Sequence, residues 1–516
     1  MKPGAGHLLA AAGVLIVLVA CVFPLGWIAV SIATFPLRFA SIDLPLLGLT
    51  LLYNFLAAVI AMAIALPIGV VLGKDRFIRT RLLWVIVPTS LLLPSMAMTY
   101  GWTQSLRLAG IVLTPGSAAD VMRCVMTLAA WLWPIPALAV GLTLRRADHS
   151  IALQALLDGA STRITLRQSL PPLLAGGAVV MLLAGQEFSV FEPTGIRVVA
   201  TEVRIVFESG LLFEGLTRSQ SDRAAAAVMT ALPLVVVTSI LALAAIVWAL
   251  REQAQHHAVV IESGNDATLW ALVPHRTTVL FAWTIVLLTL LLPIGGLLLS
   301  ARAPLSLLAA WNEFSPEVLG SLSVACLTGV IAFVAACAAA CRRSAALLAV
   351  SLVSFLVGGQ LIAIAMIRIL NRDFPFLPFD LYDSMIVPVL TYLSRFVWIA
   401  LLAGGALWAG SWRSLRDMAH LDGAGTGRTF LSVILPLSWP MLVGASLLIV
   451  AMSVTEVAAT VLIAPLNPPM LVPMLITWVH IQNYDPMISA SLLMICLTTV
   501  PGIVGVLLWG LWRQRV

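Results

Sequence analysis

Long apolar runs recur along the whole chain and constrain its fold more than any other feature. A helix needs about 20 apolar residues to cross the hydrocarbon core of a bilayer. Runs close to this length or longer occur at residues 8–33, 48–73, 82–100, 119–144, 173–192, 225–250, 277–300, 318–340, 345–370, 386–409, 437–463 and 488–512. Hydrophobic residues make up 61% of the chain and charged residues 10%, whereas soluble domains average about 25% charged. We therefore predict an all-α polytopic membrane protein with about 12 transmembrane helices.

A polar segment interrupts these runs twice. Asp158 to Leu173 reads DGASTRITLRQSLPPL, and Asp422 to Leu437 reads DGAGTGRTFLSVILPL, at an offset of 264 positions (422 − 158 = 264). The residues with identical partners at this offset include Asp158, Gly159, Ala160, Thr162, Pro172 and Leu173, and farther on Ser189, Val190 and Glu192 align with Ser453, Val454 and Glu456. Such a recurrence in one register indicates an internal duplication.

The repeat divides the chain into two halves with six apolar runs each. We predict a first transmembrane domain over residues 1–250, a polar cytoplasmic linker over 251–276 and a second transmembrane domain over 277–516. Since six is an even number, both halves enter the membrane with the same orientation. The two six-helix repeats are therefore expected to be parallel, related by an axis along the membrane normal.

The positions of the basic residues predict the orientation. Cytoplasmic loops of membrane proteins carry an excess of Lys and Arg. With the N-terminus inside, the inner segments hold 18 of the 29 basic residues, and the outer loop 464–487 holds none. The outer loop 193–224 is an exception, but long loops follow the rule poorly. This orientation places both chain termini and both copies of the repeated segment in the cytoplasm.

The repeated segment predicts two short helices joined by a bend. Gly after Asp permits backbone angles that other residues avoid, and Asp or the following Ser or Thr can cap a new helix. Pro172 and Pro436 are expected to begin the next span, where a missing N–H costs little. An amphipathic helix resting on lipid is the alternative. The two copies in register, each with the bend, favour a surface that docks another protein.

This pattern resembles the EAA loop of the permease subunits of bacterial ATP-binding-cassette (ABC) importers. That motif has E-A-A, three residues, G, nine residues and I-x-L-P. The chain has Asp417-Met418-Ala419 and Val433-Ile434-Leu435-Pro436 around Gly423, and Leu153-Gln154-Ala155 and Ser169-Leu170-Pro171-Pro172 around Gly159. The resemblance implies two coupling loops that insert into a separate cytoplasmic ATPase, formed by Ala155, Asp158, Gly159, Pro172, Asp417, Ala419, Asp422, Gly423 and Pro436.

Shorter matches extend the resemblance to importers with two fused permease domains, such as those for ferric iron and thiamine. Glu456-Val457-Ala458-Ala459-Thr460 is similar to the E-x-x-A-T segment of the iron-type permeases, and Ala200-Thr201-Glu202-Val203 to their A-T-E-[IV] segment. The resemblance implies a permease of the bacterial cytoplasmic (inner) membrane, with two ATPase copies and an external solute-binding protein that meets outer loops 193–224 and 464–487. Ferric iron, thiamine, another small organic cation and an anion all stay open as the substrate.

Sequence motifs for nucleotide or metal chemistry are absent. Gly73-Lys74 lacks the partner glycine and the following Ser or Thr of a phosphate loop. Val357-Gly358-Gly359-Gln360 only superficially resembles the LSGGQ motif of ATPases, because it lies inside an apolar run. We expect ATP and Mg on the partner ATPase, and no cofactor, metal site, nucleic-acid partner or enzymatic activity on this chain.

Three acidic side chains lie in or at the ends of predicted spans: Glu187, Glu192 and Glu456. Because burying an ionisable group in a membrane is costly, such residues suggest a function. They are candidates for lining the pathway or a gate, and structural capping is the alternative. Arg395 in the tenth run is expected to form a salt bridge with an acid.

Pro67, Pro88 and Pro94 are expected to bend spans around a central pathway, although prolines are also common in membrane helices with no such role. A competing hypothesis is an ion-coupled secondary transporter, which also commonly has twelve spans in two parallel halves. That protein would need an ion or proton relay and no ATPase, and the repeated polar segment argues against it.

Overall fold

The computed structural model shows a chain built almost wholly of helices. It describes residues 5–34, 43–74, 78–146, 154–155, 157–209, 211–212, 215–216, 220–257, 276–301, 306–372, 381–409, 411–480 and 484–515. In these residues, ten helices are long and apolar enough to cross a membrane, and counting each of two bent pairs as one span gives up to 12. The prediction of a polytopic helical membrane protein is confirmed at this level.

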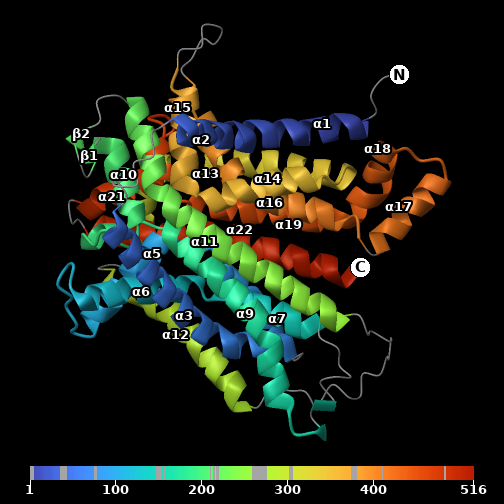
Figure 1. The fold of residues 1–516 in the computed structure, drawn as a ribbon, viewed down its shortest axis with the longest axis horizontal. Helices are drawn as coiled ribbons and strands as arrows, with labels where there is room; N and C mark the ends of the chain where they lie inside the picture. Colours follow the sequence, from blue (N-terminus) through green and yellow to red (C-terminus); the bar gives the residue numbers. More distant parts are fainter. Residues whose placement is uncertain are drawn as a thin grey trace. The chain divides into compact units, whose positions relative to one another are not determined.

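Figure 1 labels the helices and strands. By their contacts they group into two compact units. Unit 1 comprises residues 1–42, 202–231 and 301–516, and unit 2 comprises residues 43–201 and 232–300. Unit 1 holds α1 (Ala5–Val17), the π-helix η1 (Leu18–Val22), α2 (Phe23–Thr34), the antiparallel strands β1 (Leu211–Leu212) and β2 (Gly215–Leu216), α13 (Ser306–Cys341), α14 (Ala345–Val357), α15 (Gly359–Leu370), α16 (Ile386–Ala406), α17 (Ser411–Leu421), α18 (Thr426–Thr429), the π-helix η5 (Phe430–Ile434), α19 (Leu435–Thr455), α20 (Thr460–Ile463), α21 (Leu471–His480) and α22 (Tyr484–Arg515).

Unit 2 holds α3 (Leu44–Lys74), α4 (Ile78–Ser90), α5 (Ser95–Leu108), α6 (Ala118–Leu132), α7 (Pro134–Arg146), α9 (Ser161–Gln186), the 3₁₀ helix η3 (Glu192–Thr194) and α12 (Arg276–Ser300). Two helices, α10 (Val199–Ser209) and α11 (Gln220–His257), continue from one unit into the other.

The unit boundaries differ from the domain boundaries expected at residues 250 and 277. The first span packs with the later helices, since α1 lies against α13 and α2 against α15. In the same way α12, the first span of the expected second half, packs on α5 and α3 in unit 2. Small residues permit this close packing, because Gly101 on α5 lies against the backbone of Pro293. Most of the expected linker, residues 258–275, lies outside the described residues, and residues 251–257 continue α11.

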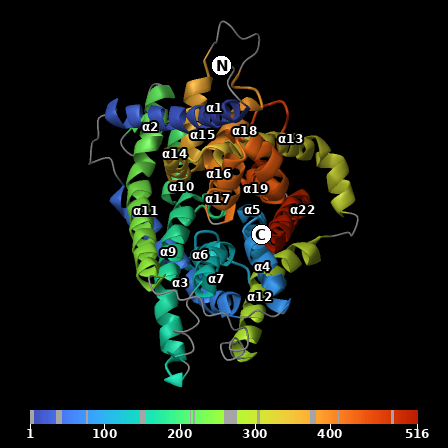
Figure 2. The same cartoon turned by 90° about the vertical axis from the view of Figure 1, so that its right-hand side faces the viewer.

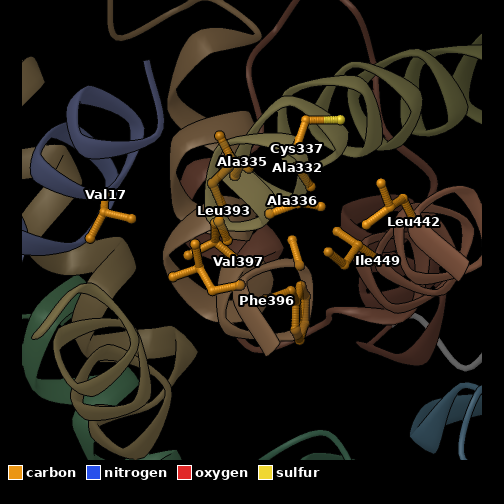
Figure 3. Close-up of a cluster of buried hydrophobic side chains, with 14 of the residues drawn as sticks. Val17, Ala332, Ala335, Ala336, Cys337, Leu393, Phe396, Val397, Leu442 and Ile449 are labelled. Carbon is orange, nitrogen blue, oxygen red and sulfur yellow. The ribbon is translucent and has the colours of Figure 1, made fainter. Parts of the chain in front are cut away.

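The core of unit 1 forms where α13, α16 and α19 meet. Figure 3 shows Ala332 and Ala336 of α13 beside Phe396 and Val397 of α16, with Ile449 of α19 in the same buried cluster. In a membrane, helices gain little from the hydrophobic effect when they associate, so close van der Waals packing of small residues stabilises them. The Ala-rich second half of α13 provides such a surface.

Gly404→Ala is expected to destabilise unit 1. A Cβ at Gly404 of α16 would collide with the backbone oxygen of Ala336 and lie 2.8 Å from the Cβ of Ala339. Neither atom ends a flexible side chain, so the helices must separate, at a cost of about 1–3 kcal/mol. We expect a lower midpoint of thermal unfolding in detergent. Gly405→Ala is the matched control, because nothing lies within 4 Å of a Cβ there, and equal midpoints for the two variants would contradict the prediction.

Two of the runs read as single spans are sharply bent in the structure. Residues Leu82–Ser90 and Ser95–Leu108 meet at 97°, and Ala345–Val357 and Gly359–Leu370 meet at 103°. The chain leaves the helical conformation inside each run. A bend in the first run was expected from its prolines, whereas the bend in the run 345–370 was not expected.

Each break has a local cause in the sequence. Pro94, with no N–H, has an extended backbone (φ −61°, ψ 130°) before α5. Gly358 has a φ of 97°, which residues with a side chain rarely adopt, and so it ends α14. Of the three prolines expected to bend spans, Pro94 lies at a break, whereas Pro67 and Pro88 lie inside α3 and α4. The sequence that resembled an ATPase motif is thus a helix break.

Candidate functional site

The first copy of the repeated segment ends a helix with a glycine bend. Gly159 has a φ of 66°, in the left-handed region. The N–H of Ala160 donates to the carbonyl oxygen of Ala155 at 2.8 Å. This bond and the left-handed glycine form the Schellman pattern, which satisfies carbonyls at the end of a helix. Ala155 is buried, whereas Asp158 is exposed. Leu153 lies outside the described residues.

The second copy forms the same bend. Gly423 has a φ of 74°, and the N–H of Ala424 donates to the carbonyl oxygen of Ala419 at 3.0 Å. Here too the alanine at the helix end is buried, and Asp422 and Asp417 are exposed. The bend expected in both copies is therefore present, and α17 is the short helix before the second one (Figure 2).

The helix after each bend runs directly into the apolar span. α9 is continuous from Ser161 to Gln186 and contains Pro172 in its interior. After the second bend, Thr426–Thr455 forms one helical run, in which Pro436 is the second residue of α19, after the five-residue π-helix η5. The expectation that a proline begins the span is therefore wrong for Pro172, whereas Pro436 does lie in the first turn of α19. Membrane helices tolerate interior proline because neighbouring groups and local π-turns satisfy the freed carbonyls.

Two leucines beside the bends are almost fully exposed. Leu157 is 86% exposed and Leu421 is 87% exposed, and each directly precedes the Asp-Gly pair of its copy. Sequence reasoning missed both, because a leucine does not stand out in so apolar a chain. The available signal was their identity at the same offset of 264 positions (421 − 157 = 264). A single exposed leucine is ordinary, but two at the same position of two polar bends form a matched pair.

Arg416 holds α17 against the ends of two long helices. Its Nη2 donates to the carbonyl oxygen of Ala340 in α13 at 2.6 Å, and its Nε donates to that of Leu407, which caps α16, at 3.3 Å. The guanidinium carbon lies 4.1 Å from the ring centroid of Trp408. Burial lowers the pKa of Arg416 from its usual value. The free carbonyls and negative dipole at helix C-termini compensate the buried cation.

A lysine ties the helix after the first bend to α3. Lys74, the last residue of α3, donates to the hydroxyl of Thr165 on α9. Thr165 donates in turn to the backbone oxygen of Ser161 at 2.7 Å. The side chain of Thr165 is buried, so this contact lies between the two helices.

Glu187 ends α9 and contacts the start of α5. Its Oε1 accepts hydrogen bonds from the N–H of Ser189 at 3.1 Å and from the hydroxyl of Ser189 at 2.6 Å. The Ser189 oxygen lies 3.1 Å from the hydroxyl oxygen of Ser95, the first residue of α5. All three side chains are buried. The carboxylate therefore reaches the break between α4 and α5 through one hydroxyl.

Glu456 ends α19 in unit 1 and forms an ion pair. Its Oε2 lies 3.5 Å from Nη2 of Arg395, and its Oε1 accepts from the N–H of Ala459 at 3.3 Å. Nη1 of Arg395 donates to the backbone oxygen of Phe355 at 3.2 Å, in the last turn of α14. The expected salt bridge of Arg395 is thus confirmed. A Cβ at Gly359, the first residue of α15, would collide with Oε1 of Glu456, so this carboxylate also lies at a break.

Glu187, rather than Glu192, resembles Glu456 in its position at the end of a long helix. Glu187 and Glu456 are both the C-cap residues of long helices, whereas Glu192 starts the 3₁₀ helix η3. Ser453 lies inside α19, but Ser189 lies in a turn. The offset of 264 positions therefore does not align the C-terminal ends of α9 and α19. The cause is helix length, since the run after the first bend has 26 residues and that after the second has 30.

A further pair of contacts follows the two acids. The N–H of Val199, which starts α10, donates to the hydroxyl of Thr50 at 3.1 Å. The N–H of Leu471, which starts α21, donates to the hydroxyl of Ser321 at 2.9 Å. Each short helix after a buried acid is thus held at its amino end by a hydroxyl from an earlier long helix.

Among the residues that the structure describes, no group of three or more His, Cys, Asp or Glu side chains has the arrangement to hold a metal ion. Each unit thus holds one exposed glycine bend and one buried carboxylate at a helix break: Gly159 and Glu187 in unit 2, and Gly423 and Glu456 in unit 1. No protein-family model, curated protein or solved structure matches the chain.

Proposed function

We propose that this chain is the transmembrane permease subunit of a binding-protein-dependent ABC importer. It forms the solute pathway, and a separate cytoplasmic ATPase, in two copies, supplies the energy from ATP and Mg. Each glycine bend is a coupling loop that docks on one ATPase. The external solute-binding protein meets the outer loops 193–224 and 464–487, and the candidate substrates are ferric iron and a thiamine-like cation.

The observation that carries the proposal is the pair of exposed leucines on two matching bends. Leu157 and Leu421 are each the last helical residue before a bend, two positions before a left-handed glycine. Both side chains are almost fully exposed. One exposed leucine is ordinary, so the support for a docking surface comes from their matched positions on two polar bends. Two such surfaces in one chain suit a partner present in two copies.

Paired features support an origin by duplication. Two bent pairs of helices occur, at 97° and 103°. The residues that start α5 and α15, Ser95 and Gly359, are separated by the same 264 positions as the bends (359 − 95 = 264). The duplicated halves enter the membrane with the same orientation, so both bends lie on one side. The loop charges favour the cytoplasm for that side, with both termini inside, and the resemblance to ABC importer permeases implies the bacterial inner membrane.

Affinity purification of the full chain from detergent-solubilised membranes, under mild crosslinking, tests the proposal. Mass spectrometry is expected to find an ATPase with a phosphate loop and an external solute-binding protein. A crosslink from the ATPase to the peptides around Leu157 and Leu421 would place it on the bends. A chain that purifies alone and still transports in liposomes would contradict the proposal.

The buried carboxylates favour one alternative, an ion-coupled secondary transporter. Glu187 and Glu456 are buried, and buried acids form the relays of such proteins. Uptake measured in cells separates the two functions. Uptake that stops when ATP is depleted supports the importer, whereas uptake that survives ATP depletion and stops when the ion gradient is dissipated supports the alternative.

A further inference from the structure

Four elements of unit 1 meet at the ion pair between Arg395 and Glu456. Arg395 projects from α16 and contacts the last turn of α14 through the carbonyl of Phe355, and its guanidinium carbon lies 5.4 Å from the ring centroid of Phe355. Glu456 ends α19. Its Oε1 lies where a side chain on Gly359, at the start of α15, would be. The pair therefore joins both sides of the break between α14 and α15 to two other long helices.

The position of this carboxylate is electrostatically favourable. The first N–H groups of a helix have no partner within the helix, and the amino end carries a partial positive charge. Glu456 lies at this end of α15 and beside a guanidinium. Both side chains are less than a tenth exposed, so loss of either charge would remove a buried charge pair, which is destabilising.

The break between α4 and α5 in unit 2 is held by a different set of groups. The hydroxyl of Ser189 has one proton and donates it to Glu187, so it accepts from the hydroxyl of Ser95. The carboxylate of Glu187 is thus joined to the first residue of α5 by a chain of two hydrogen bonds. Both units place a helix-ending glutamate at the amino end of the helix that follows a break of about 100°.

We propose that Glu187 and Glu456 are positioning residues, each of which latches one bent pair of helices in the conformation observed. Glu456 latches α14 and α15 by an ion pair, and Glu187 latches α4 and α5 through hydroxyls. Movement of either bent pair requires its latch to break. The two latches differ in strength, because the first contains a buried charge pair.

Amide hydrogen exchange of the purified full chain, followed by mass spectrometry, tests the latches. Glu456→Gln removes the charge but keeps the size, and it is expected to speed exchange at residues 358–362 by about tenfold or more. Exchange at residues 94–98 is expected to stay unchanged. Glu187→Gln is expected to give the converse result with a smaller factor. Glu192→Gln is the matched control, since Glu192 lies in η3 and not at a break.

Two results would overturn the proposal. One is unchanged exchange at both breaks in folded Glu456→Gln and Glu187→Gln proteins. The other is an equal rise at both breaks in each variant, which would mean general loss of stability. Arg395→Lys keeps the cation and is expected to give a smaller rise at residues 358–362 than Arg395→Met, whereas equal rises would argue against the ion pair.

A second readout rests on the proposed function. In a reconstituted complex with its ATPase, Glu456→Gln is expected to raise ATP hydrolysis without the binding protein several-fold, because the released break no longer holds the resting conformation. A merely structural residue would lower yield without raising this rate. If the wild-type chain binds no ATPase, the proposed function fails, and the exchange measurement still decides whether the latches exist.

Discussion

Leu157→Asp combined with Leu421→Asp is expected to remove the ATPase from the purified chain. Burying two leucines in a partner contributes about 3–6 kcal/mol. A carboxylate forced into the same apolar surface adds a desolvation penalty. Affinity is therefore expected to fall more than about 100-fold, which is measured as loss of the ATPase in co-purification and in binding to the immobilised chain.

The double variant should leave the rest of the chain intact. Leu157 and Leu421 are exposed, so changing them removes little packing within the chain. Leu466→Asp is the matched control, because Leu466 is 86% exposed but lies in the loop after α20, at a distance from both bends in the sequence. Normal co-purification of the ATPase with the double variant would refute docking at the bends.

The single variants test whether the two bends contribute equally. Near the second bend Arg416 anchors α17, whereas near the first bend Lys74 contacts α9 after the bend. Changing Gly423 would be a weaker test, because its φ of 74° means that any side chain there strains the bend itself. Changing the leucines alters the proposed docking surface without straining the backbone of the bend.

The sequence predicted those features that depend on local chemistry. The apolar runs located the spans, since helices in a membrane must satisfy their own backbone. The glycine after Asp158 and after Asp422 gave the bends, because only glycine readily adopts the left-handed conformation there. Because a buried cation needs a counter-ion, Arg395 predicted a neighbouring acid, but the sequence did not indicate that this acid is Glu456.

The features that the sequence did not predict depend on packing. The break at Gly358 lies in an apolar run, where hydropathy is the same for a straight helix and for a bent one. The similar positions of Glu456 and Glu187 at helix ends were missed because the helices after the two bends differ in length. One sequence offset therefore could not align both the starts and the ends of these helices. The grouping of α12 with α5 depends on small residues such as Gly101, whose neighbours only the structure shows.

Arg416→Met is expected to release α17 from unit 1. Methionine keeps an apolar stem of similar length but donates no hydrogen bond, so the carbonyls of Ala340 and Leu407 lose their partner. Leaving two buried acceptors unpaired costs about 2–4 kcal/mol. Amide exchange over residues 411–421 should rise by the corresponding factor, about 30-fold to several hundred-fold, while exchange in the middle of α16 stays as in the wild type.

Arg413→Met is the matched control, because Arg413 is an exposed arginine on the same helix. Amide exchange in Arg416→Lys is expected to lie between that of the wild type and that of Arg416→Met. An ammonium can bond one carbonyl, but it cannot span both and stack on Trp408 as the planar guanidinium does.

If α17 transmits the motion of an ATPase, Arg416→Met will still bind that ATPase through Leu421 but will no longer link ATP hydrolysis to uptake. Exchange over residues 411–421 that is the same in Arg416→Met and Arg413→Met would show that the guanidinium does not hold α17, and the motion of the ATPase would then have to reach α16 through other contacts.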